Sequence, residues 1–159
     1  MDTILLWPHK SLLTPTSKVE VFDSSLHKEL DDMKILLEQT QTGVGLAANQ
    51  TGLSKSMFLL KDKNGQVHEI INPVIKETTG AININEGCLS APGVIVQVPR
   101  AYDVTLEYQD RDGNNKLAVF SEIEAVIVQH ECEHLLGVFF TSKTNRQQRR
   151  YAERIMEKY

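Results

Sequence analysis

The chain has 159 residues, a formal net charge of −4 and a hydrophobic fraction of 41%. This length suits one domain with a sizeable core, so a metal ion is not needed merely to hold the chain together. The negative charge argues against a general affinity for nucleic acid, and no apolar run approaches the roughly 20 residues of a transmembrane helix. We therefore expect one domain over residues 1–159, with no membrane partner and no sequence-specific nucleic-acid partner.

The two cysteines, Cys88 and Cys132, follow no recognisable secretory leader. Disulfides are rare in reducing compartments, so these thiols predict a cytoplasmic protein whose cysteines are free or bound to a metal. A disulfide between them is the alternative. The expected setting is a bacterial cytosol, a host cytosol if the chain is phage-encoded, or an organelle if it is a processed form.

The first third of the chain predicts a wrapping segment, a helix and a glycine-rich stretch. Residues 4–22 contain Pro8 and Pro15 and predict irregular chain. A helix is expected from Ser24 or Ser25 to near Gly43, because apolar residues recur at helical spacing: Leu26, Leu30, Met33, Leu36 and Leu37. The uncharged stretch GVGLAANQ follows and ends in the amide of Gln50.

The middle of the chain predicts strands joined by tight turns. Apolar runs bounded by turn residues are expected to form strands at 57–60, 67–71, 94–98, 104–108 and 116–120. No helix separates them, which favours an antiparallel or mixed sheet.

Two further helices complete an α+β pattern. The first is expected from Ser121 to Leu136, with Ser121 and Glu124 as a capping box, Gly137 as its stop, and a buried side made of Ile123, Val126, Ile127, His130 and His134. The last helix, about residues 145–159, places Tyr151, Ile155 and Tyr159 on one stripe. The expected fold has strands packed around one buried central helix.

The central helix carries the sequence QHECEHLLG, which contains an H-E-x-x-H motif. His130 and His134 lie four positions apart, within about 40° of each other around a helix, so both imidazoles can bind one metal ion. Cys88, which follows a glycine in a predicted loop, would complete a Cys/His/His set with a fourth position open to water, as in catalytic zinc-type sites. Cys132 points roughly away from both histidines and is interpreted as a packing residue.

Helical spacing alone does not decide which glutamate faces the metal. Glu131 and Glu133 flank the histidine pair at about 80° on either side. The H-E-x-x-H motif assigns the catalytic role to Glu131, and Glu133 would then pair with a cation such as Arg100. The Gln50 amide, the Leu89 backbone N–H and Glu131 are the groups needed to hydrolyse a carbonyl compound.

Three motifs resemble those of peptide deformylases. GVGLAANQ, EGCLS and QHECEHLLG match that family in order and spacing, and the likeness spans roughly residues 4–142. The resemblance implies the deformylase α+β fold and removal of the formyl group from the N-terminal formylmethionine of nascent peptides. It implies one divalent ion, iron(II) in the cell, with zinc, nickel or cobalt able to occupy the site; the ligand set alone suggests zinc.

The resemblance also implies a role for each matching residue. Cys88, His130 and His134 bind the metal, whose bound water attacks the formyl carbonyl. Glu131 is the general acid and base, and Gln50 with the Leu89 N–H forms the oxyanion hole. Gly45 and Glu86 line the cleft, and the methionine pocket comprises Val44, Ile84, Ile123, Val126 and Ile127; ordinary core packing is the alternative for these five.

The chain departs from the family pattern at three positions. Glu133 replaces an aspartate, Glu122 stands where a glycine is common, and Ala91 is smaller than the usual branched residue. A longer side chain at Glu133 predicts a shifted contact rather than lost activity. Ala91 leaves the preference for substrate residues beyond the methionine open.

The C-terminal segment is basic within an acidic chain: Lys143, Arg146, Arg149, Arg150 and Arg154. In some relatives such a helix contacts the ribosome, which is one expectation here. A helix face solvated by charges is the alternative. No feature requires more than a monomer.

Two other classes of protein remain as alternatives. An H-E-x-x-H metalloprotease would cleave internal peptide bonds, but its third ligand is normally a downstream His or Glu. A non-enzymatic metal-binding module, or an inactive deformylase-like protein, would need no Gln50 or Glu131. A closed structural site also usually has four protein ligands.

Overall fold

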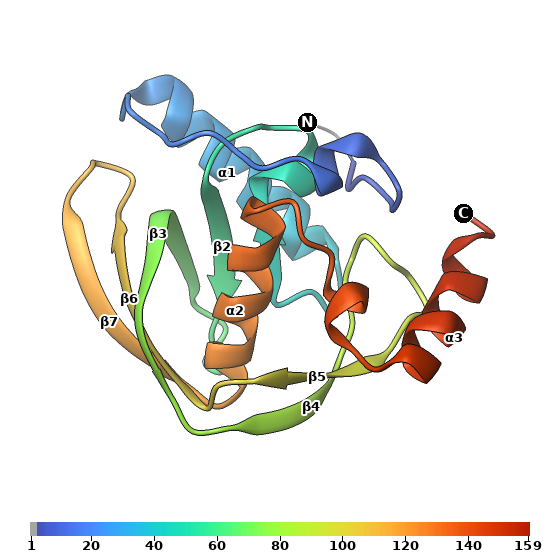
Figure 1. Ribbon diagram of the computed structural model, residues 1–159. Coiled ribbons are helices and arrows are strands. Elements are labelled where there is room, and N and C mark those ends of the chain that lie inside the picture. Colours follow the sequence, from blue (N-terminus) through green and yellow to red (C-terminus); the bar gives the residue numbers. More distant parts are fainter. Residues whose placement is uncertain (1–2) are drawn as a thin grey trace.

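The computed structural model describes residues 3–159 and combines helices with antiparallel sheets (Figure 1). The elements in chain order are η1 (Lys10–Leu13), α1 (Ser24–Gln39), β1 (Gly45–Ala47), η2 (Ala48–Thr51), β2 (Met57–Lys61), β3 (Val67–Thr79), β4 (Ile82–Glu86), β5 (Val96–Arg100), β6 (Asp103–Gln109), β7 (Asn115–Ser121), α2 (Ile123–Leu135), η3 (Phe140–Lys143) and α3 (Arg146–Met156).

Five strands form one antiparallel sheet in the order β1-β2-β3-β6-β7, and β4 pairs with β5 in a separate two-stranded sheet. The predicted strands are present, but β3 continues through Asn72 and Pro73 to Thr79, beyond the predicted end at residue 71. Proline cannot donate to a ladder, and β3 tolerates it because the register with β6 shifts there, between Ile71 and Val74. Both β1 and β4 were missed, since β1 lies within a glycine-rich stretch and β4 alternates isoleucine with asparagine.

Helix α1 packs on one face of the five-stranded sheet. Its apolar residues share a cluster with strand residues such as Leu46, Leu59 and Ile71. The predicted serine cap is wrong, because the Asp23 carboxylate accepts the Leu26 N–H at 3.0 Å and caps the helix instead. Each fully buried leucine contributes roughly 1.5–3 kcal/mol, so this face holds α1 firmly.

Helix α2 runs through the middle of the molecule, between the large sheet and the β4-β5 pair (Figure 1). Ala125, Ile127, Val128 and Leu135 pack with residues of the large sheet. Ile123 was expected on the buried side, but 58% of it is exposed. It is the first residue of the helix, and the chain there still lies at the surface.

The predicted capping box at the start of α2 does not form. Ser121 ends β7 and its hydroxyl donates to Asp103 Oδ1 at 2.5 Å, while the Glu124 carboxylate accepts the Lys63 N–H. The chain passes directly from strand to helix through Glu122, whose φ of 59° and ψ of −128° are values that favour glycine. Glu122, which stands where the family commonly has glycine, therefore has a strained backbone conformation.

The N-terminal segment covers the end of α2, as a wrapping segment was predicted to do. Gly137 has a φ of 75° and ends the helix; a Cβ there would lie 2.8 Å from the Leu13 backbone. The Thr16 N–H and hydroxyl both donate to the Leu135 carbonyl, at 2.8 and 3.0 Å. The carbonyls at the helix end are thus paired with residues far away in sequence.

Helix α3 is shorter than predicted and is held by a different stripe. Ala152 and Met156 are buried against Val96, Val98 and the phenylalanines near η3, whereas Tyr151 and Tyr159 are each 43% exposed. The two tyrosines therefore do not form the packing face, whereas Ile155, the third residue of the predicted stripe, is half-buried and packs against the same cluster. Among residues 3–159, no helix is long and apolar enough to cross a membrane.

Candidate metal centre and active site

Three side chains from two parts of the chain converge beside α2. The ligand atoms of Cys88, His130 and His134 all lie within 4.8 Å of one another, and Cys88 Sγ is 3.3 Å from His134 Nε2. One sulfur and two imidazole nitrogens form a donor set that suits zinc, iron(II) and similar ions, and leaves a coordination position free. The predicted convergence is confirmed, and the residues present fit a metal ion.

Local structure explains how Cys88 reaches the histidines. The two histidines lie one turn apart on α2, while β4 ends at Glu86 and the following loop turns back, with the Ala91 N–H donating to the Cys88 carbonyl at 3.0 Å. A Cβ on Gly87 would lie 3.1 Å from Ile95 Cδ1, so a larger residue there would require this exposed side chain to shift by a few tenths of an ångström.

His130 is oriented by a buried ion pair. Its Nδ1 lies 3.0 Å from Glu86 Oε1, and Arg100 bonds both oxygens of Glu86, at 2.8 and 2.9 Å. Burial opposes the charge on Glu86, but hydrogen bonds and charge from Arg100 and His130 outweigh it and lower the Glu86 pKa. A carboxylate on Nδ1 leaves Nε2 for a metal. Glu86, expected to line the cleft, has both oxygens engaged in this network.

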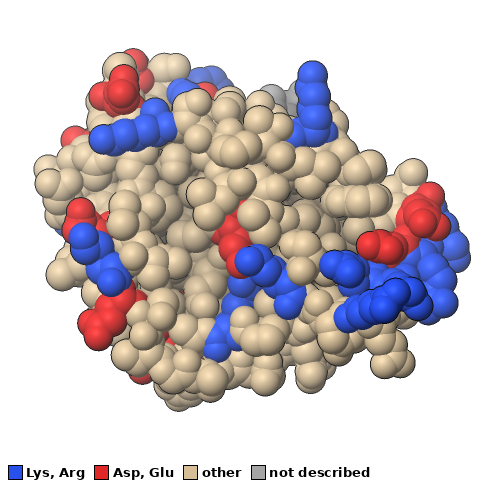
Figure 2. All heavy atoms as spheres, in the orientation of Figure 1, with Lys and Arg blue, Asp and Glu red and all other residues tan. Residues whose placement is uncertain are grey.

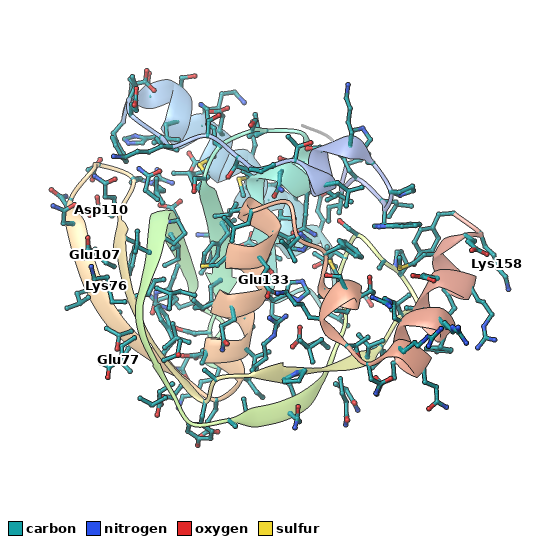
Figure 3. The ribbon with its side chains drawn as sticks, in the orientation of Figure 1. Lys76, Glu77, Glu107, Asp110, Glu133 and Lys158 are labelled. Carbon is teal, nitrogen blue, oxygen red and sulfur yellow. The ribbon has the colours of Figure 1, made fainter. Side chains whose placement is uncertain are left out.

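The two glutamates of the motif have different surroundings. Glu133 Oε1 accepts from Arg100 Nη1 at 2.6 Å, and its other oxygen lies 3.8 Å from Lys143 Nζ. The predicted pairing of Glu133 with Arg100 is confirmed, and Figure 3 places Glu133 at the side of α2. A Cβ on Gly45 would lie under 3.0 Å from Glu131 Oε2, so Glu131 points toward the glycine-rich stretch.

Glu131 is buried, with 4% of its surface exposed, and its Oε1 has no hydrogen-bond partner among residues 3–159. Burial raises the pKa of Glu131 to about 7, and the nearby charge of Glu86 adds to this rise, while His130 and Arg100 oppose it. A carboxyl group with a pKa near neutrality suits proton transfer in both directions.

The Gln50 amide is held in place from both sides. Its oxygen accepts the Ala47 N–H at 2.9 Å, and its nitrogen donates to Ser90 Oγ at 3.0 Å and lies 3.7 Å from Cys88 Sγ. The amide nitrogen therefore faces Cys88 and Ser90, the two residues that flank Leu89 in the chain. Ser90 was missed from the sequence, although it lies inside the EGCLS motif.

The expected substrate residues differ in exposure. Gly45, Val126 and Ile127 are buried, Ile84 is half-buried, and Val44 and Ile123 are 46% and 58% exposed. A Cβ on Gly45 would lie 3.1 Å from Ile127 Cγ2, so these two residues meet beside Glu131.

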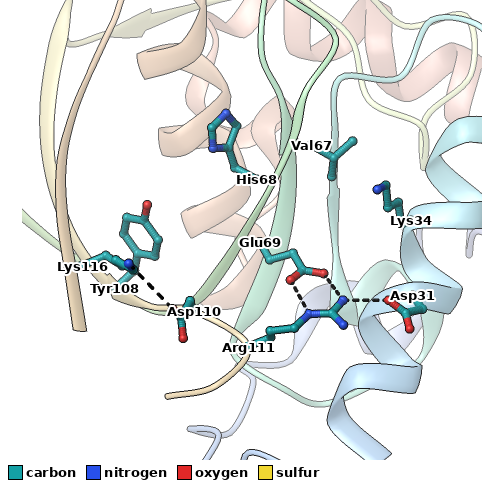
Figure 4. A pocket seen from close by; sticks show the side chains of 9 residues that line it. All are labelled: Asp31, Lys34, Val67, His68, Glu69, Tyr108, Asp110, Arg111 and Lys116. Atoms are coloured by element: carbon teal, nitrogen blue, oxygen red, sulfur yellow. Dashed lines mark hydrogen bonds and ion pairs between the residues drawn. The ribbon is translucent and has the colours of Figure 1, made fainter. Parts of the chain in front are cut away.

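A separate cavity of about 360 Å³ contains none of these residues (Figure 4). It lies between α1, β3 and the turn after β6. Arg111 bonds both oxygens of Glu69, at 2.8 and 2.6 Å, and Asp31 at 2.7 Å. These pairs connect α1 to the sheet and explain the cavity's polar lining.

Comparison with known proteins identifies the family. The family model for polypeptide deformylase matches residues 1–150. The peptide deformylase of Helicobacter pylori strain J99 is 44% identical over 147 residues, which cover 88% of this chain and 84% of that protein. The chain belongs to the peptide deformylase family.

Solved peptide deformylases share its architecture. The enzyme from Legionella pneumophila superposes with a TM-score of 0.93 at 34% identity, covering 99% of this chain and 94% of that one. The enzyme from Thermus thermophilus gives 0.90 at 31% identity, covering 99% of both chains. The predicted deformylase-like α+β fold is thus confirmed, and the chain is a hydrolase.

Proposed function

We propose that this chain removes the formyl group from the N-terminal formylmethionine of nascent polypeptides, releasing formate. Membership of the peptide deformylase family supports removal of an N-formyl group from nascent peptides. The observation that carries the finer proposal is the Cys88, His130 and His134 cluster with buried Glu131 and the Gln50 amide beside it.

A divalent ion held by these three ligands would supply a Lewis acid that activates water near neutral pH. We propose iron(II) as the native ion, with zinc, nickel and cobalt as possible substitutes. The Glu86–Arg100 pair supports the site by holding His130. Metal analysis of protein purified without air identifies the ion.

Glu131 moves the proton in this proposal. It accepts a proton from the attacking water and later gives it to the leaving amine, which frees the peptide N-terminus. The burial of Glu131 and its unpartnered oxygen support this role, whereas Glu133 is engaged by Arg100.

The oxyanion formed at the formyl carbon is stabilised by the Gln50 amide and the Leu89 N–H. The Gln50 side chain is already oriented by Ala47 and Ser90, so little reorganisation is needed as charge develops. We propose that the methionine side chain is bound by Val44, Ile84, Ile123, Val126 and Ile127, next to Gly45.

The basic C-terminal helix is proposed as a ribosome contact for a monomeric, cytoplasmic enzyme. Lys and Arg side chains gather over α3 in Figure 2, and Arg146, Arg149, Arg150 and Arg154 are exposed. Deleting α3 would also remove buried Ala152 and Met156, so charge replacement is the sharper test. Arg149→Glu with Arg150→Glu should abolish co-pelleting with ribosomes, whereas Lys76→Glu on the distant strand β3 should not.

The decisive experiment is a formate-release assay on formyl-Met-Ala-Ser under anaerobic conditions. We expect formate from this peptide and no cleavage of its unformylated twin. Cleavage of internal peptide bonds would favour a metalloprotease, and an absence of turnover with iron(II), zinc, nickel and cobalt would exclude the proposed activity.

A further inference from the structure

Asn49 joins the turn that carries Gln50 to the end of the metal-binding helix. It is 1% exposed, and its Nδ2 donates to the main-chain carbonyl of His134 at 2.5 Å. The same nitrogen lies 3.3 Å from the Ser11 carbonyl. The His134 carbonyl lies in the last turn of α2 and also accepts the Gly137 N–H at 2.9 Å, so the Asn49 amide is a second donor that ties this carbonyl to η2.

Asn49 and His134 each also have one buried side-chain atom that lacks a hydrogen-bond partner in the described part of the chain. Asn49 Oδ1 and His134 Nδ1 make no hydrogen bond within residues 3–159. His134 turns its other nitrogen, Nε2, toward Cys88 Sγ. A histidine that binds a metal through Nε2 carries a hydrogen on Nδ1, and this N–H normally donates to a neighbouring acceptor.

His130, the other histidine ligand, has such an acceptor at its Nδ1. His130 Nδ1 has the Glu86 carboxylate at 3.0 Å, whereas His134 has no carboxylate in the equivalent position in the described part of the chain. The remaining unpartnered buried oxygen is on Glu131, which the proposed chemistry reserves for water. Asn49 Oδ1 belongs to the amide whose nitrogen already bonds the His134 carbonyl, and a rotation of one of the two side chains would bring it to Nδ1, because the two atoms make no hydrogen bond to each other in this structure.

We propose that Asn49 is a positioning residue for His134: its amide nitrogen holds the main-chain carbonyl, and its amide oxygen accepts the Nδ1–H when Nε2 binds the metal. This inference rests on the proposed metal-binding role of His134. In this proposal η2 is a rigid link between two parts of the site, because its adjacent residues Asn49 and Gln50 hold a metal ligand and supply the oxyanion donor.

The test compares Asn49→Leu with Ser11→Ala in zinc-loaded, ¹⁵N-labelled protein. Leucine keeps the branched shape and the number of side-chain heavy atoms of asparagine, and it removes both contacts. Ser11→Ala removes the 2.6 Å hydrogen bond from the Ser11 hydroxyl to the main-chain carbonyl of Asn49. It leaves the side-chain amide of Asn49 in place. Asn49→Leu should raise the zinc dissociation constant about 10- to 100-fold in a chelator competition, and Ser11→Ala should leave it unchanged.

NMR separates positioning from a general loss of stability. In Asn49→Leu the Nδ1–H of His134 should lose protection from solvent exchange, while that of His130 stays protected by Glu86. Asn49→Asp, which keeps the acceptor, should retain the protected His134 signal. Unchanged zinc affinity and an unchanged His134 signal in Asn49→Leu would overturn the inference.

If the variants do not fold, measurements on the wild-type protein still test the proposed role of Asn49. A His134 Nδ1–H that exchanges as fast as free imidazole would exclude a buried acceptor. Wild-type protein that binds no zinc, iron or cobalt would instead remove the proposed metal site, so the two failures are distinguishable.

Discussion

At the level of single residues, two glutamates, each next to one of the two histidines of α2, have different surroundings. Glu133 is fixed by Arg100, which also holds Glu86 and through it His130. Glu131 is buried, close to Gly45, and has an unpartnered oxygen. Spacing along the helix left open which glutamate faces the metal, and these contacts with other strands support the proposed catalytic role of Glu131.

Replacing each glutamate by glutamine tests the assignment. Glu131→Gln should bind one metal ion normally and lose about 10²- to 10⁴-fold in kcat, because the proton carrier is gone. Glu133→Gln should keep most of its turnover. Measurements of kcat and metal content on both proteins check this, and the reverse pattern would exchange the two roles.

Gly45→Ala tests the placement of Glu131 without altering its chemistry. The added Cβ would meet the carboxylate of Glu131, which can shift because it is the end of a flexible side chain. We expect a folded protein with a melting temperature close to wild type and a kcat reduced at least tenfold. Wild-type kcat in this variant would show that the carboxylate does not depend on its position beside Gly45.

At the scale of elements, the junction between β7 and α2 is the strained point. Glu122 adopts φ 59° and ψ −128° between a strand and the helix that carries the metal ligands. Such a conformation costs a non-glycine residue about 1–3 kcal/mol. Part of any gain from glycine is offset by the greater freedom of the unfolded chain.

Glu122→Gly should therefore raise the free energy of unfolding by about 1 kcal/mol. Glu122→Ala is the matched control, since it removes the carboxylate and keeps the Cβ that causes the strain. Thermal and urea unfolding should rank glycine above both alanine and wild type. Equal stability of the two variants would show that the backbone conformation is not the cause.

At the scale of the whole molecule, three apolar clusters hold the fold independently of a metal. One lies under α1, one between α2 and the large sheet, and one under α3 and η3. A chain of this length buries enough apolar surface to fold without a metal. The proposed metal ligands lie at the edge of these clusters, so a bound ion would complete the active site and would not be needed for the apolar core.

Removal of the metal by a chelator should consequently abolish formate release while far-UV circular dichroism stays unchanged. The melting temperature should fall, because binding to the folded state adds RT ln(1 + [L]/Kd) to stability. Adding cobalt or zinc back should restore turnover. Loss of helical signal on chelation would show instead that the metal is structural.

Features that depend on local geometry could be predicted from the residues alone. Two histidines four positions apart share a helix face whatever surrounds them, and three motifs in order indicated the family and its fold. The tertiary structure decided what depends on contacts between distant segments. It confirmed the predicted pairing of Arg100 with Glu133, and it showed that Ser90 orients Gln50 and that Asn49 donates to the His134 carbonyl. It also showed that Ile123 lies at the surface and that Glu122 is strained, because both depend on how β7 enters α2. Side-chain periodicity records which face of a helix is apolar, but the partner that each polar atom meets is set only when the elements pack.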